Sequence, residues 1–281
     1  MHGHKDELEN VLAELDYSFD VIGLSETRIK KNIKPIYQIS LPGYKYYSTP
    51  TEMECGGTLL YIQNELNSKP RHDLEKVVYK QKELESTFVE LLLPKMKNII
   101  CGCIYKHPYM DINEFNECHM QPLLEKLSKE TKTIFIMGDF NINLLNINED
   151  ENTTNFFDIM TSNLLIPFII HPTRVTPTTK TVIDNIFSNS PNHRDSVSGN
   201  IRTFISDHYA QFLQIPFKKL YTKNKKDRFK RDMSKIGTQS FRNEISTIDW
   251  SNELDYNSKD INKSFSLLES KVNEVIDKYA P

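Results

Sequence analysis

Four short polar clusters in the sequence combine residue types that can carry out phosphoryl chemistry. Each cluster follows an apolar run that is typical of a β-strand, and strand ends are where sites in α/β proteins gather. Carboxylate and amide oxygens are hard ligands that suit Mg²⁺, and an acid-base group must aim water at phosphorus. The clusters are Ser25-Glu26-Thr27, Gly138-Asp139-Phe140-Asn141, Ile183-Asp184-Asn185 and Ser206-Asp207-His208.

Each cluster also has an ordinary structural interpretation. Taken alone, Gly138-Asp-Phe-Asn is more often a turn than a site, because Asp and Asn bend and cap chains for structural reasons. Ser206-Asp-His alone is equally unspecific. The interpretation as a site gains weight from the order of the motifs, each of which comes after a β-like run. In chain order they are Glu26-Thr, Tyr105-Lys-His-Pro, Gly138-Asp-Phe-Asn, Ile183-Asp-Asn-Ile-Phe and Ser206-Asp-His.

The elements that must position these motifs alternate between strands and helices, so the sequence predicts a mixed α/β fold. Predicted strands cover residues 20–25, 58–63, 88–93, 98–105, 133–137, 182–187 and 209–215. The third and fourth are separated by the turn-prone Pro94-Lys-Met-Lys, which predicts a hairpin. Predicted helices cover residues 5–15, 111–129 and 153–163, the second with Asn113 as its N-cap.

Composition limits the class of protein without identifying it. The chain has 281 residues, of which 38% are hydrophobic, so it is long and apolar enough for a globular core. A formal net charge of −3 means that any attraction to phosphates must come from local patches. The four cysteines form no CxxC pair, and no apolar run is long enough to cross a membrane. We therefore expect a soluble, intracellular protein with reduced thiols.

The ordered motifs resemble those of the endonuclease/exonuclease/phosphatase superfamily. They resemble more closely the endonuclease domain that opens the second reading frame of LINE-type non-LTR retrotransposons, and the resemblance covers residues 5–217. It implies a four-layer α/β/β/α sandwich of two mixed β-sheets flanked by helices, with DNA as the partner and the nucleus as the location. The phrases that carry it are Asp20-Val-Ile-Gly-Leu-Ser-Glu-Thr, Gly138-Asp-Phe-Asn-Ile-Asn-Leu-Leu, His171-Pro-Thr-Arg, Thr181-Val-Ile-Asp-Asn-Ile-Phe and Ser206-Asp-His.

The resemblance implies roles for residues at the metal and the phosphate. Glu26 would be the main metal ligand, and Asp207 would add a second acidic group on the metal side. The metal would be Mg²⁺, with Mn²⁺ as an alternative. Tyr105 would support the scissile phosphate, although a tyrosine at a strand end is commonly just packed. We interpret the neighbouring His107 as a structural or loop histidine, because the sequence assigns it no partner.

The resemblance also implies which residues would handle the attacking water and the developing charge. Asp139 and Asn141 would hold and orient the water. His208 would contact the phosphate and stabilise charge in the transition state, and Asp184 would orient its imidazole as in other Asp-His pairs.

Two departures from the family pattern concern the beginning of the chain. Family members start with a strand that ends in an asparagine of the site, and we expect that strand to be missing here. Its loss would open a sheet edge and remove one polar group from the site. Arg28 also stands where many relatives have tryptophan.

The sequence changes character after Pro216. Residues 218–231 hold eight basic residues and a single acidic one, and they could equally be a solvated linker or a segment that grips DNA phosphates. We predict an enzyme domain over residues 1–217, a basic linker over 218–235 and a helical connector over 236–281. The helical stretches of the connector are residues 241–248 and 261–279. A reverse transcriptase would follow such a connector, but no polymerase signature occurs in this chain.

Three functions remain in competition at this point. The first is a Mg²⁺-dependent DNA endonuclease that nicks a target strand. The second is a catalytically impaired retrotransposon remnant that acts at most as a binding module, because the first strand is missing. The third is a phosphatase of the same superfamily.

Overall fold

The computed structural model describes residues 5–30, 39–190, 193–203, 205–216, 238–253 and 261–279. The chain forms two compact units, Met1–Leu220 and Tyr221–Pro281. The predicted linker, residues 218–235, lies outside the described residues, so its boundaries stay a prediction. Among the residues that are described, no helix is both long and apolar enough to cross a membrane.

A six-stranded sheet forms the centre of the first unit, in the order β4-β5-β6-β7-β11-β8. The pair β6 and β7 runs parallel, and the other neighbours run antiparallel, so this sheet is mixed. The predicted hairpin of the third and fourth strands is confirmed as β5 and β6. The bounds are β4 (Ser68–Pro70), β5 (Leu84–Leu91), β6 (Ile99–Lys106), β7 (Thr133–Asp139), β8 (Ile166–Pro167) and β11 (Asp184–Ser188).

A second sheet of three antiparallel strands has the order β1-β3-β2. Strand β1 is therefore an edge strand among those described. Whether a further strand belongs beside it stays a prediction. Two shorter pairs, β9 with β10 and β12 with β13, complete the strands described in this unit. The bounds are β1 (Val21–Leu24), β2 (Tyr44–Thr49), β3 (Thr58–Gln63), β9 (Arg174–Val175), β10 (Lys180–Thr181), β12 (Val197–Ile201) and β13 (Ala210–Gln214).

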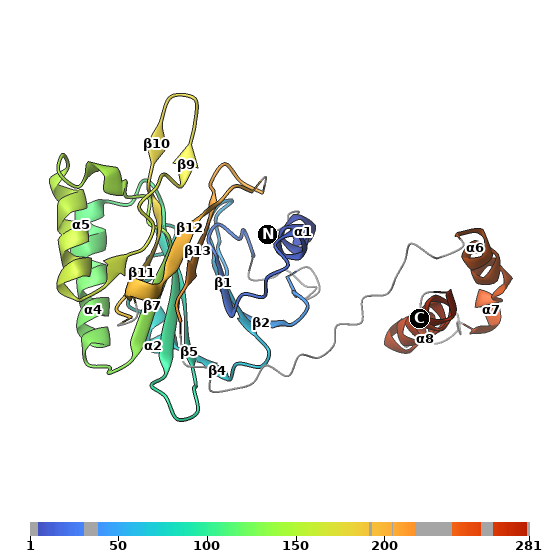
Figure 1. The fold of residues 1–281 in the computed structure, drawn as a ribbon. Helices are drawn as coiled ribbons and strands as arrows, with labels where there is room; N and C mark the ends of the chain where they lie inside the picture. Colours follow the sequence, from blue (N-terminus) through green and yellow to red (C-terminus); the bar gives the residue numbers. More distant parts are fainter. Residues whose placement is uncertain are drawn as a thin grey trace. The chain divides into compact units, whose positions relative to one another are not determined.

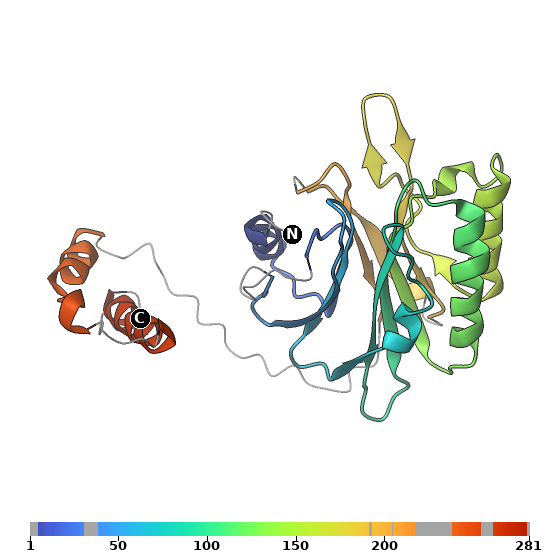
Figure 2. The ribbon, with the colours of Figure 1, turned by 180° about the vertical axis from the view of Figure 1, so that it is seen from behind.

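Helices cover the outer faces of the two sheets, which gives the four layers that the resemblance implied. Figures 1 and 2 show α4 and α5 against the six-stranded sheet and α1 against the three-stranded sheet. The bounds are α1 (Lys5–Glu14), α2 (His72–Glu75), α3 (Ile112–Glu114), α4 (Gln121–Ser128) and α5 (Glu151–Ser162). The α/β class and the layers agree with the prediction, but among the described strands only the six-stranded sheet is mixed, because the three-stranded sheet is antiparallel.

Strand alternation explains how one sequence fills three apolar layers. On β3, Leu59 and Tyr61 face α1, while Leu60 and Ile62 face the other sheet. On β6, Ile100 and Ile104 pack against the helices, and Cys101 and Cys103 pack between the sheets. A polar residue at an odd-numbered position of β6 therefore points into the space between the two sheets.

The predicted helix over residues 111–129 differs from the structure in two ways. Its N-cap is Asp111, whose carboxylate accepts a hydrogen bond from the Glu114 amide, and not Asn113. A π-helical segment, Phe115–Met120, also separates α3 from α4. Asp111 is favoured because its side chain reaches the free amide three residues on, which is the usual capping geometry.

Within the described part of the second unit the helices are α6 (Thr238–Thr247), α7 (Trp250–Glu253) and α8 (Ile261–Tyr279). Helix α8 has the predicted bounds, and α6 begins a turn earlier than predicted. The Lys278 ammonium contacts both carboxylate oxygens of Glu244 at 2.7 and 2.9 Å and so ties α8 to α6.

Candidate active site

Four polar side chains lie in one row across the six-stranded sheet. Tyr105 on β6 lies opposite Glu85 on one neighbouring strand, β5, and opposite Asp139 on the other, β7. Asp139 in turn lies opposite Asp184 on β11. Direct cross-strand partners point to the same face of a sheet. Because Cys103 lies two positions before Tyr105 and packs between the sheets, this row also faces the second sheet.

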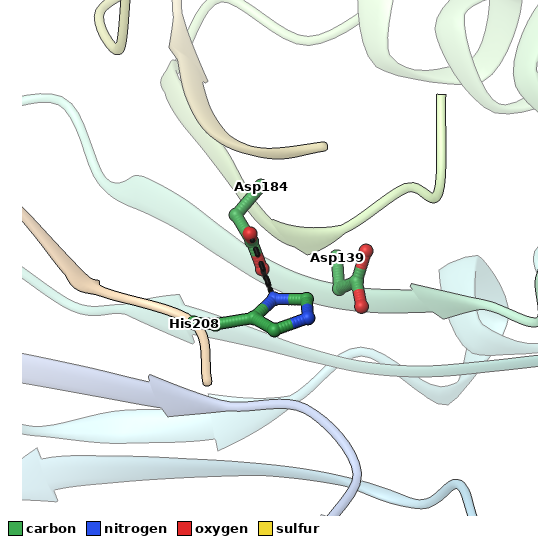
Figure 3. Close-up of side chains that lie close together, drawn as sticks. All are labelled: Asp139, Asp184 and His208. Atoms are coloured by element: carbon green, nitrogen blue, oxygen red, sulfur yellow. Dashed lines mark hydrogen bonds and ion pairs between the residues drawn. The ribbon is translucent and has the colours of Figure 1, made fainter. Parts of the chain in front are cut away.

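Asp184 and His208 form a hydrogen-bonded pair in this row. The His208 Nδ1 lies 2.9 Å from Asp184 Oδ2 and 3.1 Å from Oδ1, as Figure 3 shows. The Thr173 hydroxyl donates to the same carboxylate at 2.7 Å. Because Asp184 accepts these donors, Nδ1 carries the hydrogen and the other ring nitrogen is left on the side of Asp139.

The backbone holds His208 in place from the neighbouring segment. Arg174 and His208 form an isolated antiparallel bridge, and the Tyr209 amide donates to the Thr173 carbonyl at 2.7 Å. The segment that carries the Thr173 hydroxyl therefore also anchors the segment that carries the imidazole. The phrase His171-Pro-Thr-Arg contributed to the family resemblance, but its spacing gave no sign of this contact.

Asp139, Asp184 and His208 are the three residues whose ligand atoms all lie within 4.8 Å of one another. Burial and then the negative charge of Asp184 raise the pKa of Asp139 to about 7. Burial opposes protonation of His208, but the hydrogen bond and charge of Asp184 outweigh burial and raise its pKa. Two carboxylates this close repel each other when both are charged, and a divalent cation beside them would reduce that repulsion. Their oxygens are also the hard donors that such cations prefer.

The motif Gly138-Asp-Phe-Asn is a structural device as well as a source of polar groups. Phe140 is buried against Phe156 and Phe187, with ring centroids 5.5 and 5.4 Å apart, so it anchors the turn in the helix-facing core. Asp139 consequently points to the opposite face. Gly138 has φ of +137°, and a Cβ there would lie 1.9 Å from the Ile104 carbonyl oxygen, so only glycine fits.

Asn141 is fixed by two hydrogen bonds at the end of this turn. Its amide donates to Asp139 Oδ1 at 3.0 Å, and its side-chain Nδ2 donates to the Lys106 carbonyl at 2.8 Å. The backbone φ of Asn141 is +48°, a left-handed conformation that Asn tolerates better than most residues. The structure thus brings Asn141 to the side of Asp139, while their role in holding water stays a prediction.

Glu26 reaches the same site from the second sheet. It lies just after β1, and the Tyr105 hydroxyl donates a hydrogen bond to its Oε1. Burial, then this hydrogen bond, then the charges of Glu26 and Asp139 raise the pKa of the Tyr105 phenol. Glu26 also adds to the rise in the pKa of Asp139. The phenol therefore connects the predicted metal ligand to the buried acid.

Asp207 is turned toward the surface. The Arg174 guanidinium contacts its carboxylate from Nε at 2.8 Å and from Nη2 at 2.7 Å. Burial acts in the other direction, but this pairing lowers the pKa of Asp207. Neither Asp207 nor Glu26 belongs to the three-residue cluster, so their roles as metal ligands stay predictions.

A pocket of about 420 Å³ lies beside the segments that carry Thr173 and His208. Its lining includes the cationic side chains of Lys180 and Arg202 and the ring of Tyr209. Its lining residues are His171, Pro172, Val175, Lys180, Asn200, Arg202 and Tyr209.

Comparison with known proteins gives the family. The sequence pattern of the Endonuclease/Exonuclease/phosphatase family matches residues 1–208, and the chain belongs to this family. With the acidic cluster at its strand ends, it has the fold and the site of a phosphoester hydrolase of that family. No curated protein matches the chain.

Several solved structures share the fold at low sequence identity. The endonuclease domain of TRAS1, a telomere-specific non-LTR retrotransposon, is 14% identical, with 76% of this chain and 93% of that chain covered and a TM-score of 0.57. The 3′ phosphatase NExo from Neisseria, bound to a product DNA hairpin, is 10% identical, with 76% and 95% covered and a TM-score of 0.55. The mannosyl-6-phosphatase Bt3783 of Bacteroides thetaiotaomicron is 14% identical, with 76% and 91% covered and a TM-score of 0.51.

Proposed function

We propose that this chain is a Mg²⁺-dependent DNA endonuclease that nicks target DNA for a LINE-type non-LTR retrotransposon, with Mn²⁺ as an alternative metal. The observation that carries the proposal is the convergence of Asp139, Asp184 and His208 at one end of the sheet, with ligand atoms within 4.8 Å. The retrotransposon motifs of the sequence and the shared fold with the TRAS1 domain support the choice of DNA as substrate.

Asp139 and Asn141 would act on the attacking water. A carboxylate with a pKa of about 7 can accept the water proton near neutral pH, which is where a general base is most effective. The hydrogen bond from the Asn141 amide holds Asp139 Oδ1 in place, so the other oxygen is available to the water. The oxygen of the water would then attack phosphorus.

His208 would stabilise the charge that develops on the phosphate. Asp184 keeps the imidazole oriented and raises its pKa, so the second ring nitrogen can donate a hydrogen bond to a phosphate oxygen. When bound near Glu26, Mg²⁺ would neutralise charge on the phosphate and on the leaving oxygen. Tyr105 would hold the Glu26 carboxylate toward that position.

The test is nicking of supercoiled plasmid by the purified chain with Mg²⁺ and with EDTA. We expect Mg²⁺-dependent nicking that is lost in Asp139→Ala and in His208→Ala. Asp158→Ala is a matched control, because Asp158 is an exposed aspartate of α5 on the outer side of the sheet. Equal nicking by the two site variants and the control would refute the proposal, and absence of nicking by a folded wild-type chain would favour an impaired remnant that only binds DNA.

A phosphatase is the second candidate, because a sugar phosphatase shares the fold about as closely as the endonuclease domain does. The same preparation should be assayed on phosphomonoesters. Efficient release of phosphate from a sugar phosphate, with no plasmid nicking, would establish the phosphatase instead.

A further inference from the structure

A second polar cluster lies behind the phenol of Tyr105 and takes no part in the chemistry proposed above. It consists of Cys55 in the loop between β2 and β3, His107 just after β6, and Glu85 on β5. The His107 ring is completely buried and contacts the Tyr105 ring edge-on, with centroids 4.6 Å apart. Sequence reasoning assigned His107 no partner, whereas the structure gives it one on each ring nitrogen.

The hydrogen bonds of Glu85 fix the protonation of the imidazole. His107 Nε2 lies 3.0 Å from Glu85 Oε2, and the Thr51 hydroxyl donates to Glu85 Oε1 at 2.9 Å. Since a carboxylate only accepts, Nε2 carries the hydrogen and Nδ1 keeps its lone pair. That lone pair faces the Cys55 sulfur, with 3.9 Å between Nδ1 and Sγ, so the thiol can donate to it.

The loop is shaped to close over this pair. Gly56 follows Cys55 with φ of +106°, and a Cβ there would lie 2.9 Å from both Glu85 Oε1 and His107 Nε2. Only a residue without a side chain can pass so close, so the chain at Gly56 holds Cys55 beside the ring. Cys55 as a whole residue is half-buried, in contrast to the buried Cys101 and Cys103.

We propose that Cys55 is a reactive thiol, with His107 as its base and Glu85 as the group that orients the base, and that it is a site of covalent modification by soft electrophiles. A nucleophile, a base and a third group that orients the base are the arrangement that activates cysteines. The Cys55 proton passes to His107 Nδ1, and the resulting imidazolium is paired with the Glu85 carboxylate. The thiolate sulfur then forms a bond to the electrophilic carbon while the leaving group departs with its bonding electrons.

The other cysteines provide internal references in the same molecule. Cys118 is exposed, so access alone predicts that it reacts faster than the half-buried Cys55. Cys101 and Cys103 are buried, and burial raises the pKa of each thiol to about 12, so they should react only when the chain unfolds.

The experiment is a time course with iodoacetamide on the full chain at neutral pH, with the labelling of each cysteine measured by peptide mass spectrometry. The sulfur–carbon bond forms, the carbon–iodine bond breaks and iodide leaves. A positioned base contributes about 10²- to 10⁴-fold, and part of this gain is lost because Cys55 is less exposed than Cys118. We therefore expect Cys55 to react at least about tenfold faster than Cys118. A rate for Cys55 equal to or below that of Cys118 would overturn the proposal.

Two variants identify the base. In His107→Gln and in Glu85→Gln the rate at Cys55 should fall to that of Cys118 or below, while the rate at Cys118 stays unchanged. An unchanged rate at Cys55 in a folded variant would contradict the assigned roles, and labelling of Cys101 or Cys103 reports any variant that has unfolded. If both variants unfold, the comparison of Cys55 with Cys118 in the wild-type chain still decides. The labelling needs no phosphodiesterase activity, so its outcome is independent of the proposed function.

Discussion

Replacing Asp184 with asparagine should separate the orientation of His208 from the stability of the fold. Asp184 accepts from His208 Nδ1 at 2.9 Å and from the Thr173 hydroxyl at 2.7 Å. Asparagine has nearly the same shape, and its oxygen can accept one of these hydrogen bonds. The variant loses the negative charge and with it the charged hydrogen bond, the two Asp184 contributions that raise the pKa of His208 most.

The sign of the pH effect follows from what remains after the substitution. Burial still lowers the pKa of His208, and only the charges of Asp139 and Asp207 remain to raise it, so the pKa falls below that in the wild type. If the charged imidazole is needed, activity is present below the pKa and is lost as the pH rises through it. The alkaline limb of the pH profile should therefore move to lower pH. The stability that the pair gives to the fold follows the same rule, being present at low pH and lost as the pH rises through the folded-state pKa of His208.

The expected loss of turnover is about 10²- to 10⁴-fold, the range for a positioned acid-base group. This loss corresponds to about 3–5 kcal/mol of transition-state free energy. The assay is single-turnover nicking of plasmid DNA between pH 6 and 9, with Asp158→Asn as the matched control. A rate within about threefold of the wild type, or an alkaline limb that does not move, would refute the proposed role of the Asp184–His208 pair.

Three further predictions follow, two from buried charges and one from the loop that carries Cys55. Burial and Asp184 raise the pKa of Asp139 to about 7, so ionisation of Asp139 opposes folding and stability falls as the pH rises through that value. Asp139→Asn should abolish nicking yet raise the Tm in EDTA at pH 8 by about 2–6 °C. A lower Tm of the variant in a thermal melt would contradict this. Glu90 is 3% exposed, with Lys132 Nζ at 2.9 Å and Arg71 Nη1 at 3.2 Å. Burial opposes the charged form, but the hydrogen bonds from Lys132 and Asn98 and the charges of Lys132 and Lys69 lower the pKa of Glu90 to about 2. Glu90→Gln should therefore lose about 3 kcal/mol of unfolding free energy in urea at pH 7, and less at a pH near that pKa. An equal loss at the two pH values would argue against the network. Alkylation of Cys55 should slow plasmid nicking, because the Cys55 loop holds the segment that carries Glu26. The Thr27 amide donates to the Gly57 carbonyl, and the Arg28 amide donates to the Gly56 carbonyl. Cys55→Ser should resist this inhibition, and equal inhibition of the wild type and the variant would show that the effect arises at another residue.

The sequence predicted much of this fold because its strands are strongly patterned. Residues 58–63 match β3, and the predicted strand 98–105 is shifted by one residue from β6. Strand β2 was missed because Tyr44–Thr49 combines lysine, serine and threonine with tyrosines and shows no simple apolar alternation. The π-helical segment Phe115–Met120 was missed because the apolar spacing of an α-helix and of such a segment is too similar over one turn.

The site was predicted in part for a different reason. Position at the end of a β-like run indicated Asp139, Asp184 and His208, and the structure brings these three together. Among these three, the expected position at the end of a preceding strand was correct for Asp139 alone, because Asp184 opens β11 and His208 precedes β13. The register that puts Glu85, Tyr105, Asp139 and Asp184 in one row depends on strand pairing between distant segments, which no local pattern reveals. Likewise the ion pair between Asp207 and Arg174 joins residues that are 33 positions apart, so no local pattern indicates it.

The central claim is that the polar side chains around Asp139, at the end of the six-stranded sheet, converge on a position where a divalent cation can bind. Crystals of the chain soaked in Mn²⁺ would test it directly, because the anomalous signal of the metal shows where it binds. We predict a peak within coordinating distance of the Asp139 carboxylate, at the end of the six-stranded sheet. A well-ordered site with no peak there at millimolar Mn²⁺, or a peak only at unrelated surface carboxylates, would contradict the account.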